Sequence, residues 1–118
     1  MSLHRYTNTD GDRKTVVAIG WDRPLQGFFM TIIEVAPEPI TDTGDEAEDN
    51  ETFLFNNLEQ QIPHPKGING YLAELEHRGI DLPQQMVNEV LVDGMHNVGN
   101  KCVDHSIENS HYVRKQLF

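Results

Sequence analysis

The sequence predicts an α+β fold, in which an antiparallel β-meander of three to four strands is packed by two to three helices. Alternation with a period of two, typical of strands, runs through the first 58 residues, whereas helical apolar spacing begins near residue 68. This order, strands first and helices second, favours α+β over an alternating α/β fold. A chain of 118 residues is expected to form a single domain, 1–118.

The strongest strand signal is Lys14–Trp21, where large side chains at odd positions alternate with smaller ones at even positions. Asp10-Gly11 predicts a tight turn that joins this strand to an earlier one around Arg5–Thr7. The second long strand, Phe28–Val35, carries apolar residues on both sides. We therefore expect a central strand that is at least partly covered on both faces.

Negative charge is concentrated in one stretch. Between Pro24 and Pro65 there are nine acids and no Lys or Arg, whereas the whole chain has a formal net charge of −10. Most of these acids predict an acidic, flexible loop at about residues 37–51, because like charges at this density repel one another and keep a segment extended. A short fourth strand, Thr52–Asn57, should follow the loop, with Phe53 and Phe55 on one face.

Two helices are expected in the second half of the chain. The first has Asn69 as a candidate N-cap and stops at Gly79, and the second begins near Pro83 and ends at Gly94. The remaining segment, Cys102 to Phe118, is compatible with a third helix or with a terminal strand, and the pattern does not decide between them.

Composition excludes several functional classes. The two helices resemble a helix-turn-helix in spacing, but Gln84–Asp93 contains two acids and no base, which argues against direct nucleic-acid binding. The longest apolar run is too short to span a bilayer, so we expect no membrane association. A single cysteine and the lack of an apolar leader favour a cytoplasmic location, although residues 1–3 could be native or a cloning leader.

One turn combines side chains that are typical of a binding site. Trp21, Arg23 and Gln26 supply an aromatic ring for stacking and polar donors for hydrogen bonding at the end of a strand. The alternative is structural, with Trp21 anchoring the core.

Potential metal ligands cluster near the C-terminus, where His96, Cys102, His105 and His111 lie within sixteen residues. Their spacing matches no zinc pattern, so we expect exposed histidines and a semi-buried thiol rather than a metal site, and we expect no cofactor. Cys102 and His105 could share a helix face, but a Cys and a His at this spacing often occur by chance, so the pair does not identify a catalytic site. The catalytic residues are therefore unknown, and the chain is more consistent with a non-enzyme.

These observations favour a non-catalytic interaction or regulatory protein that binds a protein partner, and the acidic stretch favours a basic one. A sharper version is a mimic of nucleic-acid charge that blocks a DNA-binding protein. The alternatives are a small enzyme with Arg23 and a histidine in a sheet–helix groove, and a module that binds a small molecule or a metal. The edge of the meander could also pair with a second copy, which would make the protein a homodimer.

Overall fold

The computed structural model describes residues 1–10, 13–35, 51–60 and 64–118, without the side chains of Asp10, Arg13 and Glu51. The predicted acidic loop at about residues 37–51 lies outside the described residues, except for the backbone of Glu51. The predicted turn at Gly11 also lies outside them.

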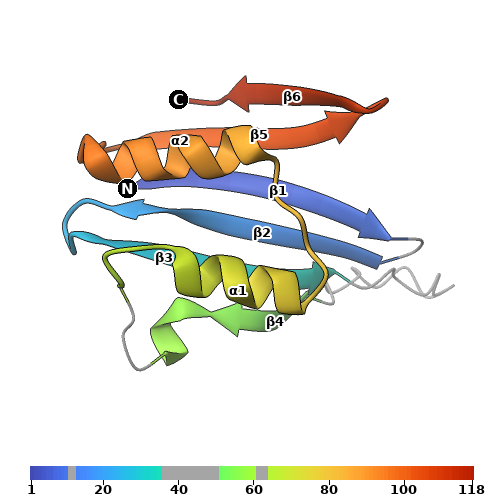
Figure 1. Ribbon diagram of the computed structural model, residues 1–118, viewed down its shortest axis with the longest axis horizontal. Coiled ribbons are helices and arrows are strands. Elements are labelled where there is room, and N and C mark those ends of the chain that lie inside the picture. Colours follow the sequence, from blue (N-terminus) through green and yellow to red (C-terminus); the bar gives the residue numbers. More distant parts are fainter. Residues whose placement is uncertain (11–12, 36–50, 61–63) are drawn as a thin grey trace, which may run out of the picture.

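The described residues form one six-stranded sheet with the order β4-β3-β2-β1-β5-β6 (Figure 1). The strands are β1 (Ser2–Asp10), β2 (Arg13–Asp22), β3 (Gly27–Val35), β4 (Glu51–Asn56), β5 (Lys101–Glu108) and β6 (His111–Gln116). Strands β1 to β4 form an antiparallel meander, as predicted. Strand β5 pairs in parallel with β1 and antiparallel with β6.

The α+β class is therefore confirmed, but the prediction of three to four purely antiparallel strands is wrong. The sheet is mixed because β5 reaches β1 through a long crossover that contains both helices, which is the kind of connection that parallel pairing requires. The C-terminal segment is a β-hairpin rather than a helix, and its two-residue turn has positive φ at Asn109 (50°) and Ser110 (66°).

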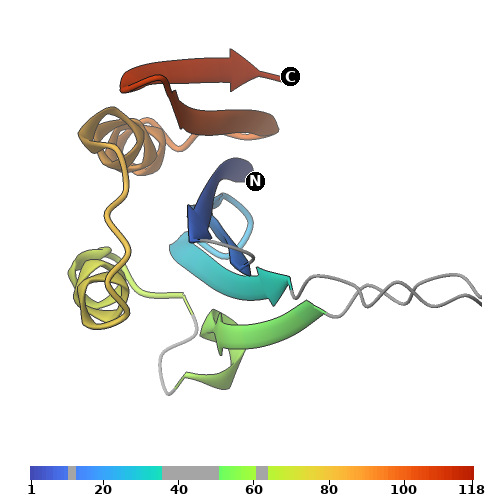
Figure 2. The ribbon, with the colours of Figure 1, turned by 90° about the vertical axis from the view of Figure 1, so that its right-hand side faces the viewer.

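Two α-helices, α1 (Asn69–His77) and α2 (Gln84–Met95), lie on the same face of the sheet (Figures 1 and 2), and a short 3₁₀ turn, η1 (Asn57–Glu59), follows β4. The N-cap of α1 is Ile68 rather than the predicted Asn69, which is already helical. Gly79 has φ +71° directly after the C-cap of α1, in agreement with the predicted stop. In the described part of the chain, no helix has the length and apolarity needed to cross a membrane.

Helix α2 continues one residue beyond the predicted end at Gly94. A Cβ atom at Gly94 would lie only 2.5 Å from Cζ of Phe28, so the absence of a side chain lets the helix approach β3 closely.

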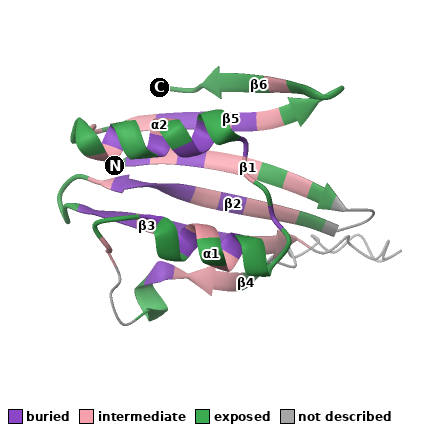
Figure 3. Ribbon diagram, in the orientation of Figure 1, coloured by how far each residue is buried: buried purple, intermediate pink, exposed green. Residues whose placement is uncertain are grey.

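The core lies between the two helices and one face of the sheet (Figure 3). Val17, Ile19 and Trp21 are buried there, as the alternation in Lys14–Trp21 predicted. The prediction that Phe28–Val35 is at least partly covered on both faces agrees with the burial of β3. Both helices pack on the face that contains Met30, and the alternate side chains of β3 are partly buried.

The prediction that Phe53 and Phe55 lie on one face of strand β4 is wrong. The pairing of β3 with β4 shifts register between Ile32 and Ile33. Phe55 packs against the core and Tyr71, whereas Phe53, opposite Ile33, is 60% exposed. A register irregularity of this kind breaks the simple alternation on which the prediction depended.

Candidate functional site

The predicted binding residues Trp21, Arg23 and Gln26 surround the loop between α2 and β5. Trp21 Nε1 and Gln26 Nε2 both donate to Asn97 Oδ1, at 2.9 and 2.7 Å, and the exposed Arg23 side chain lies over Gly99. The Trp21 ring is only 7% exposed and packs edge-on against Phe28. These contacts tie the β2–β3 turn to the α2–β5 loop, so the ligand-binding role of these three residues stays a prediction.

The four candidate metal ligands are dispersed. Cys102 and His105 lie three residues apart on β5, so their side chains point to opposite faces, unlike the helical arrangement considered from the sequence. His96 is exposed at the C-cap of α2, and His111 is exposed at the start of β6. Of the four, His105 alone joins a group of possible ligands among the described residues, together with His4 and Glu89.

A chain of four hydrogen-bonded side chains runs beneath α2 toward the edge strand β6. Asp93 Oδ2 lies 2.6 Å from His4 Nε2, His4 Nδ1 lies 2.8 Å from His105 Nε2, and His105 Nδ1 lies 2.5 Å from the hydroxyl of Tyr112. His4, Asp93 and His105 are at most 2% exposed. Because buried polar groups require partners, this chain is a specific feature of the core.

Local structure explains how these residues meet. The parallel pairing of β1 with β5 sets His4 opposite Val103 and Tyr6 opposite His105, so the two histidines are neighbours on the helix-covered face. Asp93 lies on the buried stripe of α2, three residues after Val90.

One arrangement of protons gives each of the three contacts between these four side chains a donor and an acceptor. The Tyr112 hydroxyl donates to His105 Nδ1, His105 Nε2–H donates to His4 Nδ1, and His4 Nε2–H donates to Asp93. In this arrangement each imidazole carries one proton, and each ring nitrogen of the pair has a partner.

Charged residues extend this row of hydrogen-bonded side chains on its outer side. Lys101 Nζ lies 2.8 Å from Asp93 Oδ1 and 2.8 Å from Glu89, and Arg114 binds both carboxylate oxygens of Glu89, at 2.6 and 2.7 Å. We refer to these residues and the four-residue chain as the buried polar cluster, whose members are His4, Glu89, Asp93, Lys101, His105, Tyr112 and Arg114. Its two carboxylates balance its two permanent cations when both histidines are neutral.

The pKa shifts support ionised carboxylates and a neutral His105 in this cluster. Hydrogen bonding from Arg114 is the main cause that lowers the pKa of Glu89 to about 2. Burial alone would raise the pKa of Asp93, but hydrogen bonds from His4 and Lys101 outweigh it, and the pKa lies below its ordinary value. Burial is the main cause that lowers the pKa of His105 to about 4. Both carboxylates are therefore ionised and His105 is neutral near pH 7.

The donor atoms of His4, Glu89 and His105 lie within 4.8 Å of one another, which is close enough to consider a metal ion. Two imidazole nitrogens that share a tetrahedral zinc ion lie about 3.3 Å apart, given Zn–N bonds of about 2.0 Å. Here they are 2.8 Å apart, at direct hydrogen-bonding distance. A divalent ion would also add two charges to a buried group that is already balanced, so the donor set fits a hydrogen-bonded cluster better than a metal centre.

The same chain resembles a proton relay that ends at Tyr112, but its acid–base properties do not suit catalysis. A general base works best when its pKa lies near the operating pH. The pKa of His105 is far lower, at about 4, and burial raises the pKa of Tyr112. Transfer of the phenol proton to His105 is therefore unfavourable, and the arrangement is suited to holding β1, β5, β6 and α2 together.

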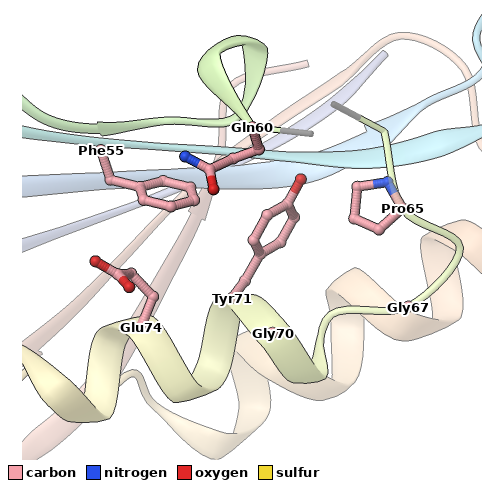
Figure 4. A pocket seen from close by; sticks show the side chains of 7 residues that line it. All are labelled: Phe55, Gln60, Pro65, Gly67, Gly70, Tyr71 and Glu74. Carbon is pink, nitrogen blue, oxygen red and sulfur yellow. The ribbon is translucent and has the colours of Figure 1, made fainter. Parts of the chain in front are cut away.

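A separate pocket of about 330 Å³ lies between α1 and β4 (Figure 4). The rings of Phe55 and Tyr71 meet edge to face in its wall, with centroids 6.0 Å apart, and the carboxylate of Glu74 lies beside them. The Tyr71 hydroxyl donates to the carbonyl oxygen of Phe28, at 3.2 Å. Glu74 also pairs with Arg78, at 2.8 Å. Aromatic faces beside a carboxylate form a suitable environment for one cationic side chain.

Comparisons with protein-family models, with curated proteins and with solved structures found no match for this chain.

Sequence reasoning did not identify six of the seven members of the buried polar cluster. One signal was available, because Asp93 recurs with Met86 and Val90 on the buried stripe of α2, where a carboxylate needs a partner. The identity of that partner was not available, because His4 lies 89 residues away in the sequence.

Proposed function

We propose that this chain is a non-catalytic interaction protein that recruits a basic protein partner through its acidic surface. The observation that carries the proposal is the stretch between Pro24 and Pro65, where nine acids occur without a single Lys or Arg. Such an asymmetric charge attracts cationic partners over distances up to the Debye length, about 8 Å at physiological salt.

The described ion pairs are consistent with this proposal. Arg5, Arg78, Lys101 and Arg114 each pair with an acid that lies outside the acid-only stretch. Four of the nine bases in the chain are thus paired with acids elsewhere in the described residues. A cationic partner is therefore better matched to this molecule than an anionic one.

Two further features agree with a binding role. The buried polar cluster contains the acid–base groups that an enzyme would need, but its low histidine pKa and internal charge balance suit a structural role. The pocket beside Phe55, Tyr71 and Glu74 offers a place for a Lys or Arg side chain of the partner. We also place the protein in the cytoplasm, on the basis of its single cysteine.

The proposal is tested by capturing partners from an extract of the source cell at low salt and eluting them at high salt. Each candidate is then purified, and its affinity is measured for two variants of equal charge. The first variant converts Asp45, Glu46 and Asp49 to their amides. The control converts Glu76, Asp81 and Glu108 to theirs.

We expect a basic partner whose affinity falls at least tenfold in the first variant and changes less than threefold in the control. The first variant should also show a shallower dependence of affinity on salt. A partner without excess positive charge, or equal losses in both variants, would contradict the proposal.

The sharper version, mimicry of nucleic-acid charge, makes its own prediction. If the captured partner binds DNA, this chain should displace a labelled duplex from it in a fluorescence anisotropy assay. Simultaneous binding of DNA and this chain would exclude mimicry while leaving a basic partner in place.

A further inference from the structure

The second face of the sheet is apolar, and no helix or strand of the described residues packs on it (Figure 2). Side chains alternate along a strand, so the neighbours of the core residues on β2 and β3 point to this second face. We call it the open face, and its apolar members on the first four strands are Leu3, Val16, Ala18, Phe29, Ile33, Val35 and Phe53.

The open face is more apolar than a solvated sheet surface needs to be. An antiparallel sheet with one solvated face typically carries polar residues there. Here Val16 is paired with Ile33 in the middle of the sheet, and the Phe29 ring lies against Gly20, with Cζ 3.0 Å from the position that a Cβ would occupy. Of the seven apolar members, Phe53 is exposed and the other six are partly buried, so part of this apolar surface stays in contact with solvent, as is typical of an interaction site.

Charges on the open face are nearly balanced. Among the residues whose side chains are described, register and alternation place three bases and three acids there, which are Arg5, Lys14, Lys115, Asp22, Asp104 and Glu108. Arg5 Nε lies 2.7 Å from Asp104 Oδ1, so this pair is already neutralised. In a chain with net charge −10, this face can meet an identical face without opposing two acidic surfaces.

The size of the open face fits a dimer. The four central strands have eight to ten residues, and the two edge strands have six. With about 3.3 Å per residue and about 4.8 Å between strands, the sheet presents on the order of 750 Å². A stable interface buries about 800 Å² on each partner.

We propose that a second copy of this chain covers the open face, so that two sheets stack face to face with the helices on the outside. This inference depends on the geometry of the sheet and is independent of the basic partner proposed above. It also differs from the edge-strand pairing expected from the sequence, because side chains rather than backbone groups form the contact. Stacked sheets lie about 10 Å apart, and the half-buried side chains of β2 and β3 would fill that space.

The test is the mass of this chain in solution, measured by sedimentation velocity between about 1 and 100 µM, a range in which an interface with a micromolar or lower dissociation constant is populated. We expect twice the chain mass of 13.5 kDa at the upper end of this range. Ile33→Arg should restore the monomer because it places a charge in the interface. Leu91→Arg is the matched control on the exposed side of α2, where Leu91 is 41% exposed, and it should remain dimeric.

A monomeric wild type at 100 µM would overturn the proposal, and so would a dimer that tolerates Ile33→Arg. If Ile33→Arg does not fold, Thr31→Arg introduces the same charge at a polar position of the same face, opposite Ala18, and should dissociate the dimer. A dimer that tolerates Thr31→Arg would point to edge-strand pairing instead and would also refute face-to-face stacking.

Discussion

The two helices lie on the same face of the sheet but are anchored by different chemistry. Helix α1 packs through Tyr71 and Leu75, and its surroundings are apolar and aromatic. Helix α2 also buries apolar residues, but it carries Asp93 into a network of histidines and cations. Apolar packing is tolerant of sequence and pH, whereas a buried polar cluster is stable only when each member keeps its partner.

The largest effect is expected from Asp93→Ala. This change leaves the buried His4 Nε2–H without its acceptor and removes one of the two carboxylates that hold Lys101. Because an unpaired buried polar or charged group is costly, we expect a loss of about 4 kcal/mol in the free energy of unfolding. Urea denaturation measures it, and the exposed Asp81→Ala serves as the control, with an expected change below about 0.5 kcal/mol. A small loss for Asp93→Ala would mean that the cluster is not coupled to stability.

A smaller loss is expected from Leu75→Ala on the α1 side. Leu75 is 1% exposed, and truncation of a buried leucine costs about 3 kcal/mol through lost burial and the cavity that remains. Leu91→Ala on the exposed side of α2 should cost less than about 1 kcal/mol. The loss at Leu75 should be the same at pH 7 and pH 5, because no titrating group is involved. A loss that depends on pH would contradict the separation of the two helices.

The dependence of the free energy of unfolding on pH should distinguish the polar surroundings of α2 from the apolar surroundings of α1. The pKa of His105 is about 4 in the folded protein and about 6.5 in an unfolded chain. As pH falls from 6.5 to 4, the unfolded chain takes up a proton that folded His105 does not, so stability decreases across this window. We expect a decrease on the order of 2 kcal/mol, followed by a further decrease as Glu89 is protonated toward its pKa of about 2.

His105→Gln removes the titrating group, so its stability should vary less between pH 6.5 and 4 than that of the wild type. Leu75→Ala is the control, because it should lower the profile without changing its shape. Parallel profiles for the wild type and His105→Gln would show that His105 is not held neutral by its environment.

The comparison of the two helices also shows what could be predicted from the sequence. Strands β2 and β3 and both helices were predictable because their apolar periodicity is local. The β5–β6 hairpin was not, because Val103 and Ile107 are four residues apart and fit a helix as well as a strand. In the structure Val103 is buried and Ile107 is 50% exposed, so the spacing carried no information on its own.

The buried polar cluster could not be predicted from the sequence, for a different reason. The His4–His105 contact joins residues 101 positions apart through the parallel pairing of β1 with β5, and no local pattern encodes that pairing. The candidates chosen from proximity in the sequence, such as Cys102 with His105, instead point to opposite faces of β5. Proximity in the sequence identifies shared faces only when the secondary structure is known, and for this segment the sequence did not decide between helix and strand.

The most direct test of a closed, neutral cluster is the protonation state of His4 and His105, measured through the ¹⁵N chemical shifts of their imidazole rings at pH 7. The pKa of His105, about 4, predicts that its ring is neutral at pH 7, and the direct hydrogen bond between the two rings predicts that one equivalent of Zn²⁺ leaves both resonances unchanged. A positively charged His105 at pH 7, or a shift of both rings on addition of zinc, would contradict a purely structural cluster and would reopen the catalytic or metal-binding alternatives.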